Sequence, residues 1–173
     1  LDLNELKRFI YQLDFLDGTV TGEIAAEGEF GRIHVEQLDL KTRGSELHFA
    51  GIVSNLHTPD RLFLNVKCRE SLVNFNDVLA LLPTFDLPDY SSLDPATMEF
   101  DFDGEPLDFT TNFSVRTRAG EVTTRGAKLK IGGPERLRYA GEFTARDLNL
   151  VPFLQDEKFS SALNGVGAIT GSG

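Results

Sequence analysis

The feature of this 173-residue sequence that most constrains its fold is an internal repeat with an offset of 75 residues. The segment Thr42–Leu79 returns as Thr117–Leu154 without a gap, and nine positions hold the same residue in both copies. Between these positions hydrophobic residues match hydrophobic residues, as in the pair Leu47 and Val122. A repeat of this kind predicts one structural unit placed beside a copy of itself. It argues against a single enzymatic pocket.

The repeat divides the chain into two units, a lead-in and the start of a third unit. We expect an amphipathic lead-in helix over residues 1–14, because apolar residues return there at helical spacing. The first β-repeat unit then covers residues 15–95 and includes a short terminal helix and a connection. The second unit covers residues 96–162, and residues 163–173 begin the third.

Most of the remaining sequence alternates between apolar and polar residues, which predicts β-strands with one apolar face. The apolar phase slips at Glu36-Gln37, which predicts a β-bulge, and we place a similar slip at Thr111-Asn112. Turns are predicted at Asp17-Gly18, Asp103-Gly104 and Asn164-Gly165. The predicted fold class is all-β with a few short helices, in which antiparallel repeated units form a folded-over groove.

Each unit ends in a segment that returns to helical spacing. In the first unit this segment is 72–82, which stops before Pro83, and in the second unit residues 148–154 mirror it. Residues 83–95 hold three prolines and three aspartates. We expect them to form a connection that is ordered by its apolar residues, including Tyr90.

Composition restricts the classes of partner. The formal net charge of −10 disfavours nucleic acid and a polyanionic membrane surface, because no basic patch would attract phosphate. No apolar run approaches the roughly 20 residues of a membrane-spanning helix. Cys68 is the only cysteine, so no disulfide can form within the chain, and its place in an alternating segment predicts a small buried hydrophobe. We interpret the sequence as a fragment of a longer protein.

Metal and cofactor sites are not expected. His34, His48 and His57 come from different strands and a loop, without carboxylates or cysteines at ligand spacing, so we expect solvated histidines. The segment Asp101–Glu105 has some likeness to a calcium loop but lacks the glutamate at the twelfth position. The Gly165-x-Gly167 pattern does not lie between a strand and a helix, as a phosphate-binding loop requires.

A catalytic site is not expected either, because no Gly-x-Ser-x-Gly or comparable motif occurs. Arg43 and Glu46 recur as Arg118 and Glu121, and recurrence in both units favours a structural role. We predict that each Arg-Glu pair brackets the turn beside it and contributes about 0–1 kcal/mol.

The candidate functional surface is the apolar face of the predicted strands. Its predicted lining is Leu62, Leu64, Val66, Phe100, Phe102, Phe109, Leu137, Tyr139 and Phe143. Such a face could line an open trough, where acyl chains gain roughly 25 cal/mol per Å² of apolar area removed from water. It could equally fill a closed sandwich core or form an exposed flat face, because each requires the same alternation.

Several short signatures resemble the AsmA-like envelope proteins, and within them the repeat region of the TamB translocation and assembly module. The segments that carry the resemblance are Leu16–Gly22, Leu38–Gly44, Leu47–Gly51, Tyr139–Phe143 and Asp147–Leu150. The resemblance covers nearly the whole chain, but it contains no catalytic motif. The connection over residues 83–95 departs from the family pattern.

The resemblance implies a β-taco or repeating β-groove fold with an apolar trough. It also implies a periplasmic location in a Gram-negative cell, with an inner-membrane anchor outside this fragment. The implied role is phospholipid transfer or outer-membrane assembly, with acyl chains as ligands and an assembly partner bound through other parts of the full-length chain. It supplies no lipid-binding side chains to assign here.

The sequence leaves two other functional classes open. An extracellular β-repeat adhesin or carbohydrate-binding module would need exposed aromatic platforms, and the absence of tryptophan counts against it. A hydrolase would need a catalytic motif. We therefore expect a non-enzymatic protein.

Overall fold

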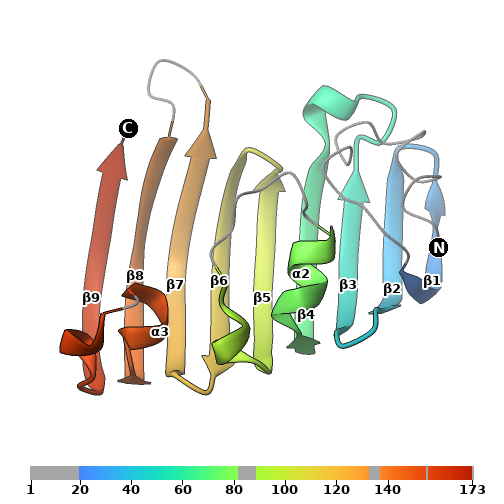
Figure 1. Cartoon of the computed structure of the whole chain (residues 1–173). Helices are drawn as coiled ribbons and strands as arrows, with labels where there is room; N and C mark the ends of the chain where they lie inside the picture. Colours follow the sequence, from blue (N-terminus) through green and yellow to red (C-terminus); the bar gives the residue numbers. More distant parts are fainter. Residues whose placement is uncertain (1–19, 82–88, 133–136, 155, 173) are drawn as a thin grey trace.

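The described part of the chain forms one open antiparallel sheet. The computed structural model describes residues 20–81, 89–132, 137–154 and 156–172. Nine strands follow one another in chain order from β1 to β9, which are the two edges of the sheet (Figure 1). The predicted all-β, antiparallel fold class is confirmed. The predicted lead-in helix and the Asp17-Gly18 turn lie outside the described residues.

The strands match the repeat recognised in the sequence. They are β1 (Thr21–Glu29), β2 (Arg32–Lys41), β3 (Glu46–Ser54), β4 (Phe63–Val73), β5 (Ala96–Glu105), β6 (Asp108–Thr117), β7 (Gly120–Ile131), β8 (Leu137–Leu148) and β9 (Leu163–Ser172). Helix α2 (Phe75–Leu81) follows β4, and helix α3 (Val151–Leu154) follows β8. The described residues also include the short 3-10 helices η2 (Pro59–Arg61), η3 (Ser91–Leu93) and η4 (Glu157–Phe159). We call β1–β4 with α2 the first set, and β5–β8 with α3 the second set.

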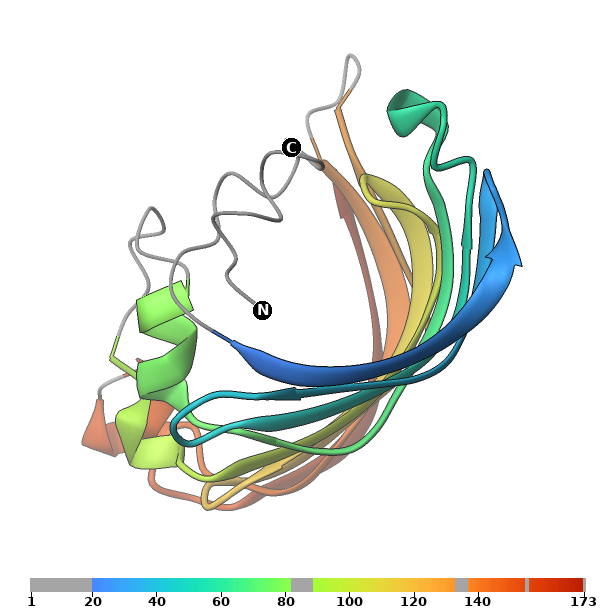
Figure 2. The same cartoon turned by 90° about the vertical axis from the view of Figure 1, so that its right-hand side faces the viewer.

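The sheet is strongly curved. Figure 2 shows that the strands bow in the same direction, and that α2 and α3 lie on the concave side at one end of the strands. We call this end the closed end and the concave face the trough. None of the described helices is long and apolar enough to cross a membrane.

The register places the apolar residues of neighbouring strands on one face. A cross-strand row runs from Phe49 in β3 through Cys68 in β4 and Phe100 in β5 to Phe113 in β6. Side chains alternate between the two faces of a strand, so the residues two positions away belong to the same face. Val115, two residues after Phe113, lies in a pocket with the helices, which identifies this face as the concave one.

One predicted bulge is confirmed, and the other corresponds to a register shift between Thr111 and Ser114 whose extra residue lies in the neighbouring strand. The pairing of β2 with both neighbours shifts between Val35 and Leu38, as the slip at Glu36-Gln37 predicted. The predicted slip at Thr111-Asn112 is not in β6, which pairs with β5 without interruption. The extra residue is in β7, between Arg125 and Lys128, where Gly126 has a φ of 59°.

Two predicted turns are strand positions. Gly104 remains inside β5, which ends at Glu105, and a Cβ atom there would lie 2.4 Å from the carbonyl oxygen of Asp108. Asn164-Gly165 lies inside β9, where Gly165 pairs with Ala145. Glycine after Asp or Asn is an ordinary turn signal, because glycine adopts backbone conformations that other residues avoid. At Gly104, however, glycine is needed inside a strand because the backbones of β5 and β6 approach closely.

The helical segments are shorter than their sequence pattern predicts. Strand β4 continues through Val73, so α2 begins only at Phe75, and strand β8 continues through Leu148, so α3 begins at Val151. The apolar residues at the end of each strand and those of the following helix pack at the same end of the sheet. Their combined spacing in the sequence therefore resembles that of one longer amphipathic helix. Leu82 of the predicted helical segment and residues 83–88 of the predicted connection lie outside the described residues.

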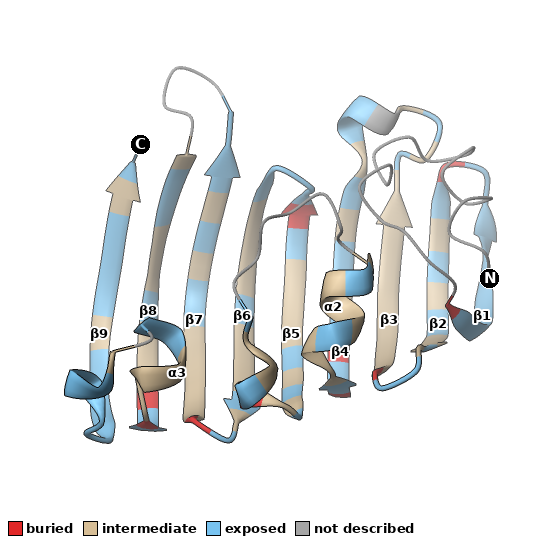
Figure 3. Ribbon diagram, in the orientation of Figure 1, coloured by how far each residue is buried: buried red, intermediate tan, exposed pale blue. Residues whose placement is uncertain are grey.

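Burial is limited across the sheet, as Figure 3 shows. Among the described residues the buried hydrophobic side chains are Val20, Cys68, Leu93, Ala119, Ala145 and Leu148. Cys68 is fully buried, as predicted, and burial raises the pKa of its thiol. The described residues contain no second sheet that covers the concave face, so this part of the chain has a trough instead of a sandwich core.

Candidate functional site: an apolar trough

The aromatic side chains of the strands gather on the concave face. Of the eight aromatic residues in the nine strands, seven share the concave phase: Phe49, Phe100, Phe102, Phe109, Phe113, Tyr139 and Phe143. The rings of Phe102 and Phe109 stack with centroids 4.3 Å apart. This one-sided distribution gives the trough an almost unbroken hydrocarbon surface.

The predicted lining residues of the strands all lie on the concave phase. Leu64 and Val66 come from β4, Phe100 and Phe102 from β5, Phe109 from β6, and Leu137, Tyr139 and Phe143 from β8. Leu62 directly precedes β4 and is half-buried. Tyr139 remains 37% exposed, so the surface is accessible near β8.

A first pocket lies in the middle of the trough, over β6 to β9. This mid-trough pocket has a volume of about 360 Å³, and its apolar lining includes Phe109, Phe113, Leu129, Tyr139, Phe143 and Ile169. Glycines of β9 make room for the rings of β8. A Cβ atom on Gly167 would lie 2.7 Å from the Phe143 ring, and one on Gly171 would lie 2.4 Å from the Tyr139 ring. The two rings therefore lie across the edge strand and widen the apolar surface.

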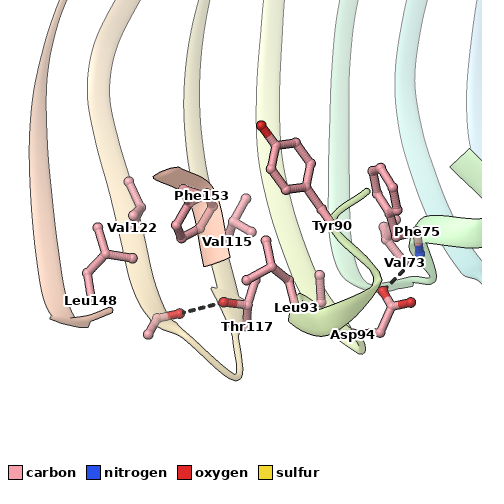
Figure 4. A pocket seen from close by; sticks show the side chains of 12 residues that line it. Val73, Phe75, Tyr90, Leu93, Asp94, Val115, Thr117, Val122, Leu148 and Phe153 are labelled. Atoms are coloured by element: carbon pink, nitrogen blue, oxygen red, sulfur yellow. Dashed lines mark hydrogen bonds between the residues drawn. The ribbon is translucent and has the colours of Figure 1, made fainter. Parts of the chain in front are cut away.

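A second pocket lies at the closed end, beneath the helices (Figure 4). This closed-end pocket has a volume of about 290 Å³. Its roof is a ladder of three rings: Phe75 and Tyr90 have centroids 5.4 Å apart, and Tyr90 and Phe153 have centroids 6.1 Å apart. Its floor includes Val115 and Val122. The ring of Tyr90 thus joins the helix of the first set to that of the second.

Sequence reasoning missed the residues that shape these pockets. Phe113 and Val115 lie an even number of residues after Phe109, so strand alternation alone would have been enough to predict them as lining residues. The positions of Phe75 and Phe153 could not be obtained in this way. They meet Val115 and Val122 only because the curved sheet brings two helices to the same end.

The closed end of the first set is held by a carboxylate. Asp77 Oδ2 accepts hydrogen bonds from Thr42 Oγ1 at 2.6 Å, from the Gly44 backbone N–H at 2.8 Å and from Ser45 Oγ at 2.8 Å. Partial burial acts to raise the pKa of Asp77, but these hydrogen bonds outweigh it and lower the pKa. We call this arrangement the Asp77 clamp. It fastens α2 to the turn between β2 and β3.

The convex face is polar. The Arg-Glu pairs predicted beside its turns are partly wrong, because the glutamates have other partners. Glu46 and Glu121 each bridge the predicted turn, but their partners are Lys41 at 2.6 Å and Arg116 at 3.3 Å. Arg43 and Arg118 are turn residues that make no ion pair with these glutamates in the described structure. A side chain next to the turn on the adjacent strand reaches across the hairpin more directly than one within the turn.

The histidines form no common site. His48 Nδ1 lies 2.8 Å from Asp39 Oδ1, and the hydrogen bond from His48 lowers the pKa of Asp39. His34 lies on the convex face, and the His57 ring contacts that of Phe30 in the loops at the other end of the strands. Residues 20–81, 89–132, 137–154 and 156–172 contain no group of three or more His, Cys, Asp or Glu side chains that could hold a metal ion.

Comparisons with protein-family models, curated proteins and solved structures give no match to this chain. The resemblance to AsmA-like proteins therefore stays a prediction.

Proposed function

We propose that the trough binds the acyl chains of phospholipids, and that the chain is a non-enzymatic part of a Gram-negative envelope protein. In this proposal it serves phospholipid transfer or outer-membrane assembly in the periplasm. An inner-membrane anchor and the binding site for an outer-membrane assembly partner lie outside this sequence.

The observation that carries the proposal is the one-sided distribution of aromatic and aliphatic side chains on an open sheet. An apolar surface that remains partly exposed, as at Tyr139 and Ile169, is typical of a surface that binds a hydrophobic ligand. The mid-trough pocket offers mainly hydrocarbon contacts, because the charged residues of its lining, Lys128 and Glu142, have the convex phase. Such a surface suits acyl chains, which need a dry environment and no specific polar partner.

The adhesin or carbohydrate-binding alternative has less support. Sugar recognition uses exposed aromatic rings beside polar groups. In the nine described strands, Phe63 is the only aromatic residue on the convex, polar face.

Native mass spectrometry of the purified chain, produced in a Gram-negative host, tests the proposal. We expect bound phospholipid in the wild type and its loss in Phe143→Asp, because this change places a charge in the mid-trough pocket. The matched control is Thr144→Asp, because Thr144 is the next residue in β8 and faces the convex side. It should retain the lipid. Wild-type protein that is folded and free of lipid, with no uptake from phospholipid vesicles, would refute the proposal.

A further inference from the structure

Among the residues that the structure describes, the closed-end pocket differs from the rest of the trough because it has both a floor and a roof. The ladder of Phe75, Tyr90 and Phe153 covers the concave face only at this end (Figure 4). Leu93 and Leu148, which are both only 8% exposed, belong to its lining. A ligand that lies in the trough and enters this pocket therefore meets well-packed apolar side chains there.

Two polar side chains of the lining, Asp94 and Thr117, are hydrogen-bonded within the chain. Asp94 Oδ1 accepts a hydrogen bond from the Phe75 backbone N–H at 2.8 Å. The Thr117 hydroxyl donates to the Gly120 carbonyl oxygen at 3.3 Å and accepts from the Ala119 backbone N–H at 3.0 Å. Figure 4 places the Tyr90 hydroxyl on the side away from Thr117, towards the middle of the strands. The inner end of the pocket thus has little to offer a charged or hydroxylated group.

The two pockets are neighbours along the strands. Val115 lines the closed-end pocket and Phe113 the mid-trough pocket, and Val122 and Thr124 have the same relation in β7. From Val115 to Phe109 the strand advances about 20 Å, at about 3.4 Å per residue. One leaflet of a bilayer has a hydrocarbon thickness of about 15 Å. The combined length of the two pockets is therefore sufficient for one membrane acyl chain.

We propose that the closed-end pocket holds the methyl end of one unbranched alkyl chain, whose remaining length lies along β6 and β7 in the mid-trough pocket. This inference rests on the proposed function and adds an orientation to it. The chain lies parallel to the strands, and its headgroup is directed away from the helices. A headgroup in the closed-end pocket would lose its hydration without gaining hydrogen bonds, which is unfavourable.

Photocrosslinking of the whole chain tests this orientation. The probes are two phosphatidylethanolamines, one with a diazirine at the methyl end of an acyl chain and one with a diazirine next to the ester. We expect the methyl-end probe to label Tyr90, Leu93 or Phe153. The ester-side probe should label residues farther from the helices, such as Phe109 or Tyr139.

Two substitutions that fill the closed-end pocket test the inference further, and the internal repeat supplies a matched control for each. Val122→Phe and Val115→Phe place a ring in the closed-end pocket. Leu47→Phe and Leu40→Phe change the positions 75 residues earlier, in the first set. We expect each filling variant to weaken binding of the methyl-end probe about tenfold, the effect of withdrawing about two methylene groups from an apolar site. The controls should bind as the wild type does. Circular dichroism identifies any variant that has not folded. If one filling variant fails to fold, the other filling variant and its control decide the test.

The outcomes separate this inference from the proposed function. If both probes label only mid-trough residues and the folded filling variants bind normally, the orientation is wrong and the trough still binds acyl chains. The orientation is also wrong if the ester-side probe labels Tyr90 or Phe153 in preference to the methyl-end probe. If neither probe labels any concave residue, both proposals are wrong.

Discussion

The closed ends of the two sets have similar turn sequences but are stabilised differently. Thr42 and Thr117 start equivalent turns, and in both the threonine hydroxyl accepts a hydrogen bond from a backbone N–H of the turn. In the first set the turn is then fastened to α2 by Asp77. In the second set the position of Asp77 is taken by Pro152. There the Asn149 backbone N–H instead donates to the Ala119 carbonyl oxygen at 2.6 Å.

This difference shows which parts of the repeat are structural and which can vary. The turn and the asparagine at the start of the helix are kept, since Asn74 and Asn149 each accept a hydrogen bond from the backbone N–H two residues later. The polar clamp is not kept. At the end of the second set, Gly120 replaces Ser45, and Phe153 contributes to the roof of an apolar pocket. One copy is fastened by hydrogen bonds, and the other leaves a cavity beneath aromatic rings.

The largest expected difference between the sets concerns two equivalent glycines. A Cβ atom on Gly51 would lie 2.1 Å from the Asn65 carbonyl oxygen, whereas one on Gly126 would meet nothing within 4 Å. We expect Gly51→Ala to lower the free energy of unfolding by about 3 kcal/mol, because the backbone of β4 must move. Gly126→Ala should cost only about 1 kcal/mol, because its φ of 59° disfavours alanine but no atom obstructs it. Urea denaturation measures both, and equal losses would contradict the distinction.

The Asp77 clamp is expected to have the next largest effect. Asp77→Ala leaves three donors without their acceptor and should lower the free energy of unfolding by about 2 kcal/mol. The matched change in the second set is Pro152→Ala, which removes no hydrogen bond and should alter stability by less than about 1 kcal/mol. A Pro152→Ala effect as large as that of Asp77→Ala would mean that the two ends are held in the same way.

The clamp also predicts a pH dependence for the first set. The pKa of Asp77 is lowered below its ordinary value of 3.8 in the folded protein. Its contribution to stability is therefore complete above that value and is lost as the pH falls through the folded pKa. We expect the stability difference between wild type and Asp77→Asn to be constant above about pH 5 and to shrink below about pH 4. A difference that grows on acidification would contradict the clamp.

The smallest expected effects belong to the ion pairs that recur in both sets. Glu46→Gln and Glu121→Gln should each lower the free energy of unfolding by less than about 1 kcal/mol, because their cationic partners Lys41 and Arg116 are largely exposed. High salt should reduce both effects, because it screens exposed charges. A loss above about 2 kcal/mol in either variant would show that the pair is essential to its hairpin.

The local parts of this fold could be predicted from the sequence, and its non-local parts could not. Alternation was sufficient to place Leu64, Val66, Phe100 and Phe102 on one face, because strand geometry alone determines which side chains share a face. The strand positions of Gly104 and Asn164-Gly165 were missed, because the same dipeptides are ordinary turn signals. The choice between a trough and a sandwich core, and the pocket beneath Tyr90, depend on sheet curvature, which no local pattern specifies.

The central claim is that the concave face, and not the convex one, meets acyl chains. The native chain contains no tryptophan, so a single introduced tryptophan reports on its own surroundings. The most direct measurement compares the fluorescence of Phe143→Trp and Thr144→Trp in the presence of phosphatidylcholine with brominated acyl chains, with unbrominated lipid as the reference. We predict strong quenching at position 143 and little at position 144. Equal quenching at both positions, or none at position 143, would contradict the account.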